Sequence, residues 1–200
     1  MYNVNQSIRK RPFIFIKEAL NSLKTDKPII VEVGSMRKPC THPLDEYNHE
    51  CCNDGHSSLL LARAAKEFHT VDIDVECSKL TLKELKTHNL NKQSFVYNGD
   101  GIKFLTDFDK KIDFLYLDAW DVELPKHAEM HLEAFKIAED KPNDGAVILI
   151  DDTDIAFTPE RGFHNDEEAL GGKGKLLIPY LLNKKFKLLF KGRQTCFIKL

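Results

Sequence analysis

The chain has 200 residues, of which 42% are hydrophobic and 30% charged, and its formal net charge is −2 at pH 7. These values predict one globular domain spanning residues 1–200 and give no electrostatic reason to expect a nucleic-acid partner. No stretch approaches the roughly 20 apolar residues of a membrane span, and the first residues lack the shape of a signal peptide. Five unevenly spaced cysteines favour reduced thiols, so we expect a cytoplasmic protein without membrane contacts.

The spacing of apolar residues predicts helices and strands that alternate along the chain. Helices are expected over residues 12–23, 59–67, 77–88, 102–108, 124–140 and 174–184, with Ser57 or Ser58 as the N-cap of the second. Strands are expected over 29–35, 68–73, 94–97, the apolar run beginning at Ile112, 146–150, 186–190 and 195–200. Residues 141–145 have turn composition, and 153–170 are expected to form a mobile loop. This order predicts a doubly wound, Rossmann-like, mostly parallel α/β sheet with a C-terminal antiparallel hairpin.

Acidic residues follow two of the predicted buried strands. Asp118 comes directly after one strand, and Asp151 and Asp152 come directly after the next. If the strands are parallel neighbours, the three carboxylates meet at the carboxyl edge of the sheet, where ligands bind in open α/β folds. They would repel one another unless a cation lay among them or some were protonated, so we expect a divalent-metal site. The alternative is that Asp151 and Asp152 cap the following loop.

The first half of the chain has features of a nucleoside site. A carboxylate after the second strand can hold two ribose hydroxyls, which makes Asp72 the first candidate and Asp74 the second. Asp74 can instead cap the next helix. The glycine fingerprint of dinucleotide sites and the P-loop lysine pattern are both absent, so a nucleoside without phosphates is favoured over NAD or ATP.

Several short motifs together resemble class I S-adenosylmethionine-dependent methyltransferases. Glu32-Val-Gly-Ser with Asp54-Gly-His-Ser-Ser resembles their split first motif, Thr70-Val-Asp-Ile-Asp the second, and Asn98-Gly-Asp-Gly the third. The resemblance covers about residues 29–151 and the C-terminal hairpin. It implies the following contacts with S-adenosyl-L-methionine: Gly34, Glu32 and Ser57 near the methionine part, Asp72 on the ribose, Asp100 and Gly101 beside adenine, and Asp118 and Trp120 next to the cofactor. Asp100-Gly101 could also be a plain turn, and Trp120 a buried structural residue.

Within that superfamily, Leu117-Asp-Ala-Trp-Asp121 with Ile150-Asp-Asp152 is similar to cation-dependent O-methyltransferases of the catechol, sugar and macrolide types. This implies Mg²⁺ held by Asp118, Asp151 and Asp152. Catechol-type enzymes have a lysine base three residues after the first metal ligand. Asp121 occupies that position, and we regard it as either the catalytic base or a solvated loop acid. His164 could reach the substrate, whereas His127 and His131 are expected to be exposed helix residues.

Residues 36–53 interrupt the pattern as an inserted loop rich in cysteine and histidine. A lid over the cofactor or substrate is the favoured interpretation, and surface decoration or a zinc site built from Cys40, His42, His49, Cys51 and Cys52 are the alternatives. The sequence therefore favours Mg²⁺-assisted O-methylation of a hydroxyl on a small molecule such as a sugar or natural product. A metal-independent N- or O-methyltransferase and a non-catalytic S-adenosylmethionine-binding protein are the rivals. The sequence also allows a homodimer.

Overall fold

The computed structural model describes residues 12–40, 56–165 and 172–200. Its helices are α1 (Pro12–Asn21), α2 (Ser57–Ala64), α3 (Val75–Thr87), α4 (Gly101–Asp107), α5 (His127–Ala138), the 3-10 helix η3 (Gly172–Gly174) and α6 (Leu177–Leu182). Its strands are β1 (Ile29–Val33), β2 (Glu67–Asp72), β3 (Ser94–Asn98), β4 (Ile112–Leu117), β5 (Pro142–Ile150), β6 (Ile155–Thr158), β7 (Gly162–Asn165), β8 (Phe186–Phe190) and β9 (Thr195–Lys199).

Seven of these strands form one sheet in the order β3-β2-β1-β4-β5-β9-β8. Strands β1 to β5 pair in parallel, and β9 lies antiparallel to both β5 and β8. The chain reverses its direction of strand addition between β1 and β4, which is the switch point where ligands bind in such sheets. The predicted mostly parallel Rossmann-like sheet with a C-terminal antiparallel hairpin is confirmed.

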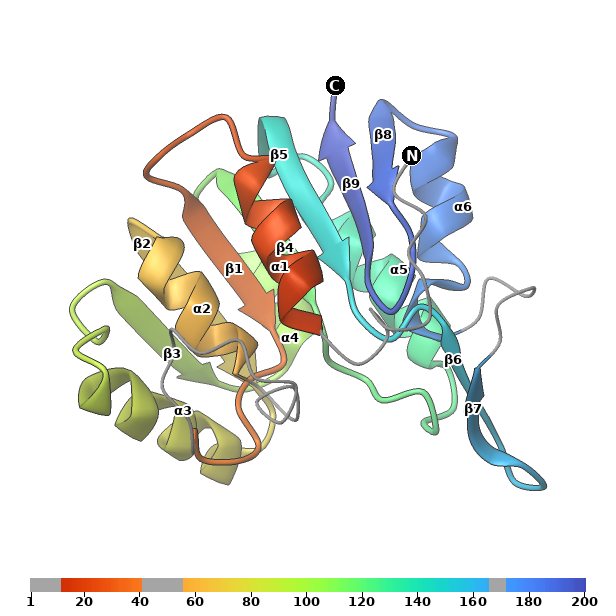
Figure 1. Cartoon of the computed structure of the whole chain (residues 1–200), viewed down its shortest axis with the longest axis horizontal. Helices are drawn as coiled ribbons and strands as arrows, with labels where there is room; N and C mark the ends of the chain where they lie inside the picture. Colours follow the sequence, from red (N-terminus) through yellow and green to blue (C-terminus); the bar gives the residue numbers. More distant parts are fainter. Residues whose placement is uncertain (1–11, 41–55, 166–171) are drawn as a thin grey trace.

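Helices cover both faces of the sheet (Figure 1). Helices α1, α2 and α3 lie on one face, where Ile16, Leu59 and Leu85 join the apolar core. Helices α4, α5 and α6 lie on the other, where Leu105, Phe135 and other buried residues pack against β4 and β5. Within the described ranges, no helix is both long enough and apolar enough to cross a membrane.

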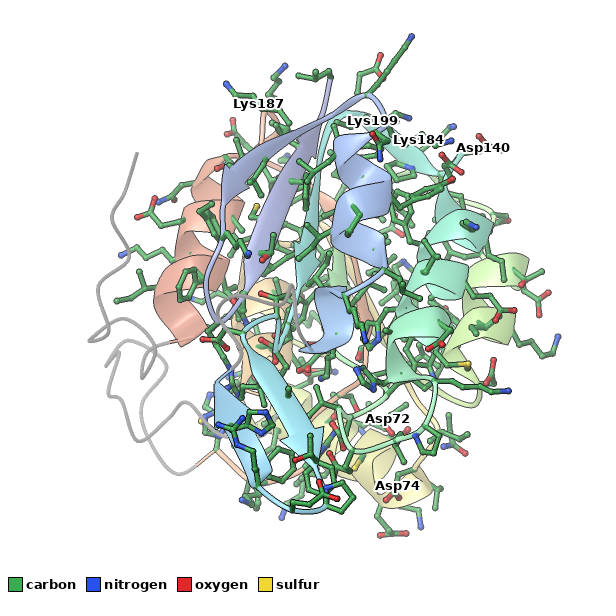
Figure 2. The ribbon with its side chains drawn as sticks, turned by 90° about the vertical axis from the view of Figure 1, so that its right-hand side faces the viewer. Asp72, Asp74, Asp140, Lys184, Lys187 and Lys199 are labelled. Carbon is green, nitrogen blue, oxygen red and sulfur yellow. The ribbon has the colours of Figure 1, made fainter. Side chains whose placement is uncertain are left out.

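Different charged residues lie at the two ends of the sheet. Figure 2 shows Asp72 and Asp74 at one end of the molecule and Lys184, Lys187 and Lys199 at the other. Asp72 is the last residue of β2, so its end is the carboxyl edge of the parallel strands. The predicted site residues follow strands that end at this edge.

Three local predictions were wrong. Residues 155–165, expected within a mobile loop, contain the antiparallel pair β6–β7, which extends from the main body in Figure 1. Strand β5 begins at Pro142, because proline can occupy the first position of a strand. Helix α2 begins after His56, and the hydroxyls of Ser57 and Ser58 bind a distant carboxylate instead of capping it.

Candidate functional site

The three acidic side chains expected to converge do so at the carboxyl edge. Leu117 at the end of β4 pairs with Ile150 at the end of β5, so Asp118 and Asp151 follow paired positions on neighbouring strands. One carboxylate oxygen from each of Asp118, Asp151 and Asp152 lies within 4.8 Å of the other two. The juxtaposition that motivated the metal prediction is therefore present.

A lysine to which the sequence analysis assigned no role lies inside this acidic cluster. Nζ of Lys173 is 2.6 Å from Oδ1 of Asp118, 2.9 Å from the Asp118 backbone oxygen and 3.3 Å from Oδ2 of Asp152. The side chain is only 1% exposed. Burial disfavours the charged amine, but Asp118 and Asp152 outweigh it and raise the pKa of Lys173 above its usual value. The ammonium is therefore charged at neutral pH, and three acceptors match its three hydrogens.

Two glycines allow Lys173 to reach this position. Gly172 has φ +62°, and a Cβ there would lie 1.9 Å from the backbone oxygen of Asp152 and 2.5 Å from that of Ile155. A Cβ on Gly174 would lie 2.5 Å from Cδ1 of Ile178. The 3-10 turn thus packs against the loop after β5 at a distance that only glycine permits. A lysine flanked by glycines was the signal that could have identified this residue from the sequence.

Arg193, in the turn between β8 and β9, adds a second positive charge. Its Nη2 atom is 2.6 Å from Oδ1 of Asp152. Burial would raise the pKa of Asp152, but Lys173 and Arg193 together hold this pKa below its usual value. Asp152 is therefore an ionised carboxylate between two cations.

Asp151 has a different electrostatic environment. Its Oδ1 accepts a hydrogen bond of 2.7 Å from Nε2 of Gln194, which also donates to the hydroxyl of Tyr116 at 2.8 Å. Burial and the neighbouring Asp118 raise the pKa of Asp151 well above its usual value. The side chains of Asp151 and Asp118 are hydrogen-bonded to each other, and burial favours the neutral form of Asp151.

Mg²⁺ fits the ligand types of this cluster but not its space. The ion takes carboxylate oxygens at about 2.0–2.1 Å. An ion bound by both Asp118 and Asp152 would need the volume that Nζ of Lys173 fills, because this atom already bridges the same two residues. The folded residues therefore do not fit a resident divalent ion, and Mg²⁺ binding stays a prediction.

The predicted base, Asp121, lies at the edge of the cluster. Its Oδ1 is 2.8 Å from Nη2 of Arg37 and 3.9 Å from Nζ of Lys173, and its side chain is 31% exposed. Asp121 and Asp152 both line a cavity of about 290 Å³, together with Arg37, Val122, Glu123, Ile155, Phe163 and Arg193. This cavity is beside the acidic cluster and can hold a small molecule with polar groups.

Two glycines allow close packing at the switch point. Gly34 has φ +98°, and a Cβ there would lie 2.9 Å from the backbone nitrogen of Ala119 and from the carbonyl carbon and oxygen of Asp118. A Cβ on Gly101 would lie 2.5 Å from Cγ1 of Val33. The ends of β1 and β4 and the start of α4 therefore approach closely. The assignment of both glycines to the cofactor stays a prediction.

Glu32 forms a buried hydrogen-bond network. Its carboxylate accepts from the hydroxyls of Ser57, Ser58 and Thr70 at 2.7, 2.6 and 2.8 Å, and the side chain is fully buried. Burial raises the pKa of Glu32 to about 7. The network ties β1 to β2 and to the start of α2. Contact of Glu32 and Ser57 with the methionine part of a cofactor stays a prediction, since both are already engaged with each other.

Asp72 and the loop after it form the opposite wall of the switch point. Oδ2 of Asp72 accepts from the backbone nitrogen of Ser35 at 2.8 Å, and Oδ1 accepts from that of Asp74 at 2.9 Å. Ile73 between them is 77% exposed and offers an apolar surface. Asp74 caps α3 through Glu76, in agreement with its alternative interpretation. The ribose role of Asp72 stays a prediction.

Asp100 caps α4, since its carboxylate accepts from the backbone nitrogen of Lys103 at 2.8 Å. The residue also lines a cavity of about 450 Å³ between β3 and α4, where the aromatic rings of Phe95, Tyr97 and Phe104 gather. A role beside adenine stays a prediction for Asp100.

Trp120 and His131 pack together next to the acidic cluster. Their ring centroids are 5.2 Å apart in an edge-to-face arrangement, and Trp120 also lies over the start of α4 near Gly101. His131 is fully buried, so the expectation of an exposed residue was wrong. Burial lowers the pKa of His131 to about 3, and the ring is neutral. His127 is half-buried, and His164 lies on β7 with Nδ1 3.0 Å from the backbone oxygen of Gly162.

The inserted loop is only partly visible. Cys40 is half-buried and packs against the core under α2, whereas His42, His49, Cys51 and Cys52 lie outside the described residues. The lid and zinc interpretations therefore stay predictions.

Residues 48–170 match the family model of the spermine/spermidine synthase domain, which is more than half of the chain. The chain belongs to the spermine/spermidine synthase domain family. The matched residues include Asp118, Asp151 and Asp152, whereas Lys173 and Arg193 lie after the matched region. No curated protein sequence is significantly similar to the chain.

Solved structures with the same fold include an O-methyltransferase from Bacillus cereus in complex with SAH, at 15% identity and a TM-score of 0.60, covering 100% of this chain and 84% of that one. The O-methyltransferase TomG from Streptomyces achromogenes, in complex with SAM, has 16% identity and a TM-score of 0.61, with 98% and 81% covered. An rRNA methylase from Streptococcus thermophilus has 12% identity and a TM-score of 0.62, with 95% and 97% covered. The resemblance of this spermine/spermidine synthase domain to class I methyltransferases is thereby confirmed as a likeness of fold.

Proposed function

We propose that the chain is an S-adenosylmethionine-dependent methyltransferase whose acceptor is a hydroxyl group of a small molecule. The observation that carries the proposal is the position of the acidic cluster and its cavity directly beside the glycine-lined switch point. A donor at the switch point and an acceptor in the cavity would then be neighbours. The O-methyltransferases of the same fold, one in complex with SAH and one with SAM, support this assignment.

The donor half is supported by the shape and chemistry of the edge formed by β1 and β2. Gly34 and Gly101 let the ends of β1 and β4 and the start of α4 approach closely at this edge, and the Asp72 carboxylate can accept from ribose hydroxyls. Ile73 gives a flat base an apolar surface to cover.

Methyl transfer to oxygen forms a C–O bond as the S–C bond breaks, and the acceptor hydroxyl loses its proton. Asp121 and Asp152 both line the acceptor cavity, so either carboxylate can be within reach of that proton. We assign the role to Asp121, because Asp152 is held by both Lys173 and Arg193. Arg37 orients Asp121 by their 2.8 Å ion pair. Alignment of oxygen, methyl carbon and sulfur supplies most of the remaining rate enhancement.

A small molecule is preferred over RNA as the acceptor, although an rRNA methylase shares the fold. The formal net charge is −2, and the acceptor cavity combines carboxylates with arginines that already have ion-pair partners. A phosphate backbone would need free positive charge there. A cavity of about 290 Å³ is more suitable for a sugar-sized or natural-product-sized compound.

The experiment has two arms. Calorimetry with S-adenosylmethionine and S-adenosylhomocysteine tests donor binding, and methyl transfer to a panel of hydroxylated compounds, with and without EDTA, tests the reaction and whether it needs a metal. Failure to bind either nucleoside would refute the proposal. Binding without transfer to any acceptor would support the non-catalytic alternative.

A second candidate is transfer to a primary amine without a metal. The specific observation is that an alkylammonium group, that of Lys173, already binds the acidic cluster. The family description as a spermine/spermidine synthase domain points in the same direction. Including putrescine and spermidine in the acceptor panel separates the two candidates, because the favoured acceptor then shows whether oxygen or nitrogen is modified.

A further inference from the structure

We propose that Lys173 is a built-in cation that takes the place of a divalent ion between Asp118 and Asp152, and that it positions these carboxylates without a metal. The proposal deepens the proposed function by naming what organises the acceptor end of that site. Its central test does not depend on turnover, so it can fail while the methyltransferase assignment stands.

The ammonium group of Lys173 lies where a shared divalent ion would have to bind. The atom that bridges Asp118 Oδ1 at 2.6 Å and Asp152 Oδ2 at 3.3 Å is Nζ of Lys173. Mg²⁺ shared by the same two carboxylates would have to lie between the same atoms, at about 2.0–2.1 Å from each. The two cations cannot occupy the cluster together.

The side chain of Lys173 is also held firmly in this position. Its side chain is 1% exposed, and a third acceptor, the backbone oxygen of Asp118, is 2.9 Å from Nζ. The backbone nitrogen of Lys173 donates to the backbone oxygen of Asp152 at 3.3 Å. The contact of Gly172 with the backbone oxygens of Asp152 and Ile155 brings the turn closer to the segment after β5 than any other residue would allow. Swinging the side chain out would require the whole 3-10 turn to move.

The charges of the cluster support the same conclusion. Lys173 and Arg193 bring two positive charges to a cluster of three carboxyl groups. A divalent ion added to this arrangement would meet little net negative charge, whereas removing Lys173 would leave three carboxyl groups, with oxygen atoms at ligand spacing, facing Arg193 alone. Lys173 therefore acts through Asp118 and Asp152 as a positioning residue, with no contact to the acceptor of its own.

The test is Mn²⁺ binding, measured by electron paramagnetic resonance and calorimetry on the full chain. The wild type is expected to show no site that depends on Asp118. Lys173→Ala is expected to gain a site that binds Mn²⁺ at least tenfold more tightly than any site of the wild type and that is lost again in Lys173→Ala/Asp118→Asn. Lys175→Ala, which alters an exposed lysine two residues away, is the matched control and should gain nothing.

Lys173→Met distinguishes the loss of the positive charge from the opening of volume for a metal ion, because methionine fills most of the lysine volume without a charge. We expect it to bind Mn²⁺ more weakly than the alanine variant. Wild-type binding of Mn²⁺ that is lost in Asp118→Asn would overturn the proposal, and this measurement needs no variant at Lys173. A folded Lys173→Ala chain that gains no site would overturn it as well. In the wild type, turnover that resists EDTA is the corresponding expectation for the reaction.

Discussion

Replacing Lys173 by methionine should destabilise the fold strongly, and the size of the effect follows from its contacts. The change keeps most of the side-chain volume, so it leaves no large cavity, but it removes the cation between Asp118 and Asp152. Removing one partner of a buried ion pair typically costs about 3–5 kcal/mol, because the remaining charge is left without compensation. At a urea m-value of about 2 kcal/mol/M, the unfolding midpoint should fall by roughly 2 M.

The pH dependence of this loss distinguishes the electrostatic explanation from a packing defect. In the wild type, the low pKa of Asp152 contributes stability above about pH 3.8, and this contribution is lost as the pH falls through the folded value. Without Lys173, the buried carboxylates should have raised pKa values, so the folded variant is expected to gain stability as the pH falls from 8 to 5. The difference between wild type and variant should therefore be smaller at pH 5.

Urea denaturation followed by circular dichroism measures both effects. Lys175→Met, on the exposed side of the same segment, is the control and should change the free energy of unfolding by less than about 0.5 kcal/mol. Adding Asp118→Asn to Lys173→Met should recover part of the loss, because one uncompensated charge disappears. A destabilisation below about 1 kcal/mol, or one that does not vary with pH, would refute the electrostatic account of the cluster.

Three further predictions test other parts of the site. Asp121→Asn should lower the methyl-transfer rate by about 10²–10⁴-fold with donor affinity unchanged, whereas Glu123→Gln in the same cavity should have little effect. Equal losses of rate in the two variants would exclude Asp121 as the proton acceptor. Gly34→Ala should lower the free energy of unfolding by about 2–3 kcal/mol, because φ is +98° and the new Cβ would meet Asp118 and Ala119. The control Gly162→Ala, with φ +61° but open space around its Cβ, should lower it by only about 1 kcal/mol, and similar losses in both variants would contradict the close approach at Gly34. Glu32 has a folded pKa of about 7, above the usual 4.5, so it should contribute roughly 3 kcal/mol of stability below pH 4.5 that is lost as the pH rises through 7. Glu32→Gln should flatten this part of the pH–stability profile in urea titrations, and an unchanged profile would show that Glu32 is ionised throughout.

The sequence was sufficient for the sheet and the acidic cluster because both depend on local patterns. Asp118, Asp151 and Asp152 each follow a continuous apolar run, and the parallel register of β4 and β5 then brings them together without further information. The close approach of Gly34 to the backbone of Asp118 and Ala119 was not predicted, and its predicted contact with the cofactor stays a prediction.

The missed features depend on partners far away in the chain. Lys173 lies 55 residues from Asp118 and is held by it through space, so no periodicity reports the contact. Ser57 looked like a helix cap because its true partner, Glu32, is 25 residues earlier. His131 follows the spacing of an exposed helix face, yet it is covered by Trp120 and the segment around Lys173. In each case a tertiary contact overrides a local preference.

The placement of the two counter-cations has a consequence for biosynthesis. Synthesis runs from the N-terminus, so Asp118, Asp151 and Asp152 are all added to the chain before Lys173 and Arg193. Until the final segment arrives, the nascent parallel sheet has an edge of mutually repelling acids, and β9 cannot yet cover β5. The charges of the acidic cluster are thus balanced only once β9 and the segment around Lys173 have joined the sheet, and shortening the chain before Lys173 would leave the carboxylates without their counter-cations.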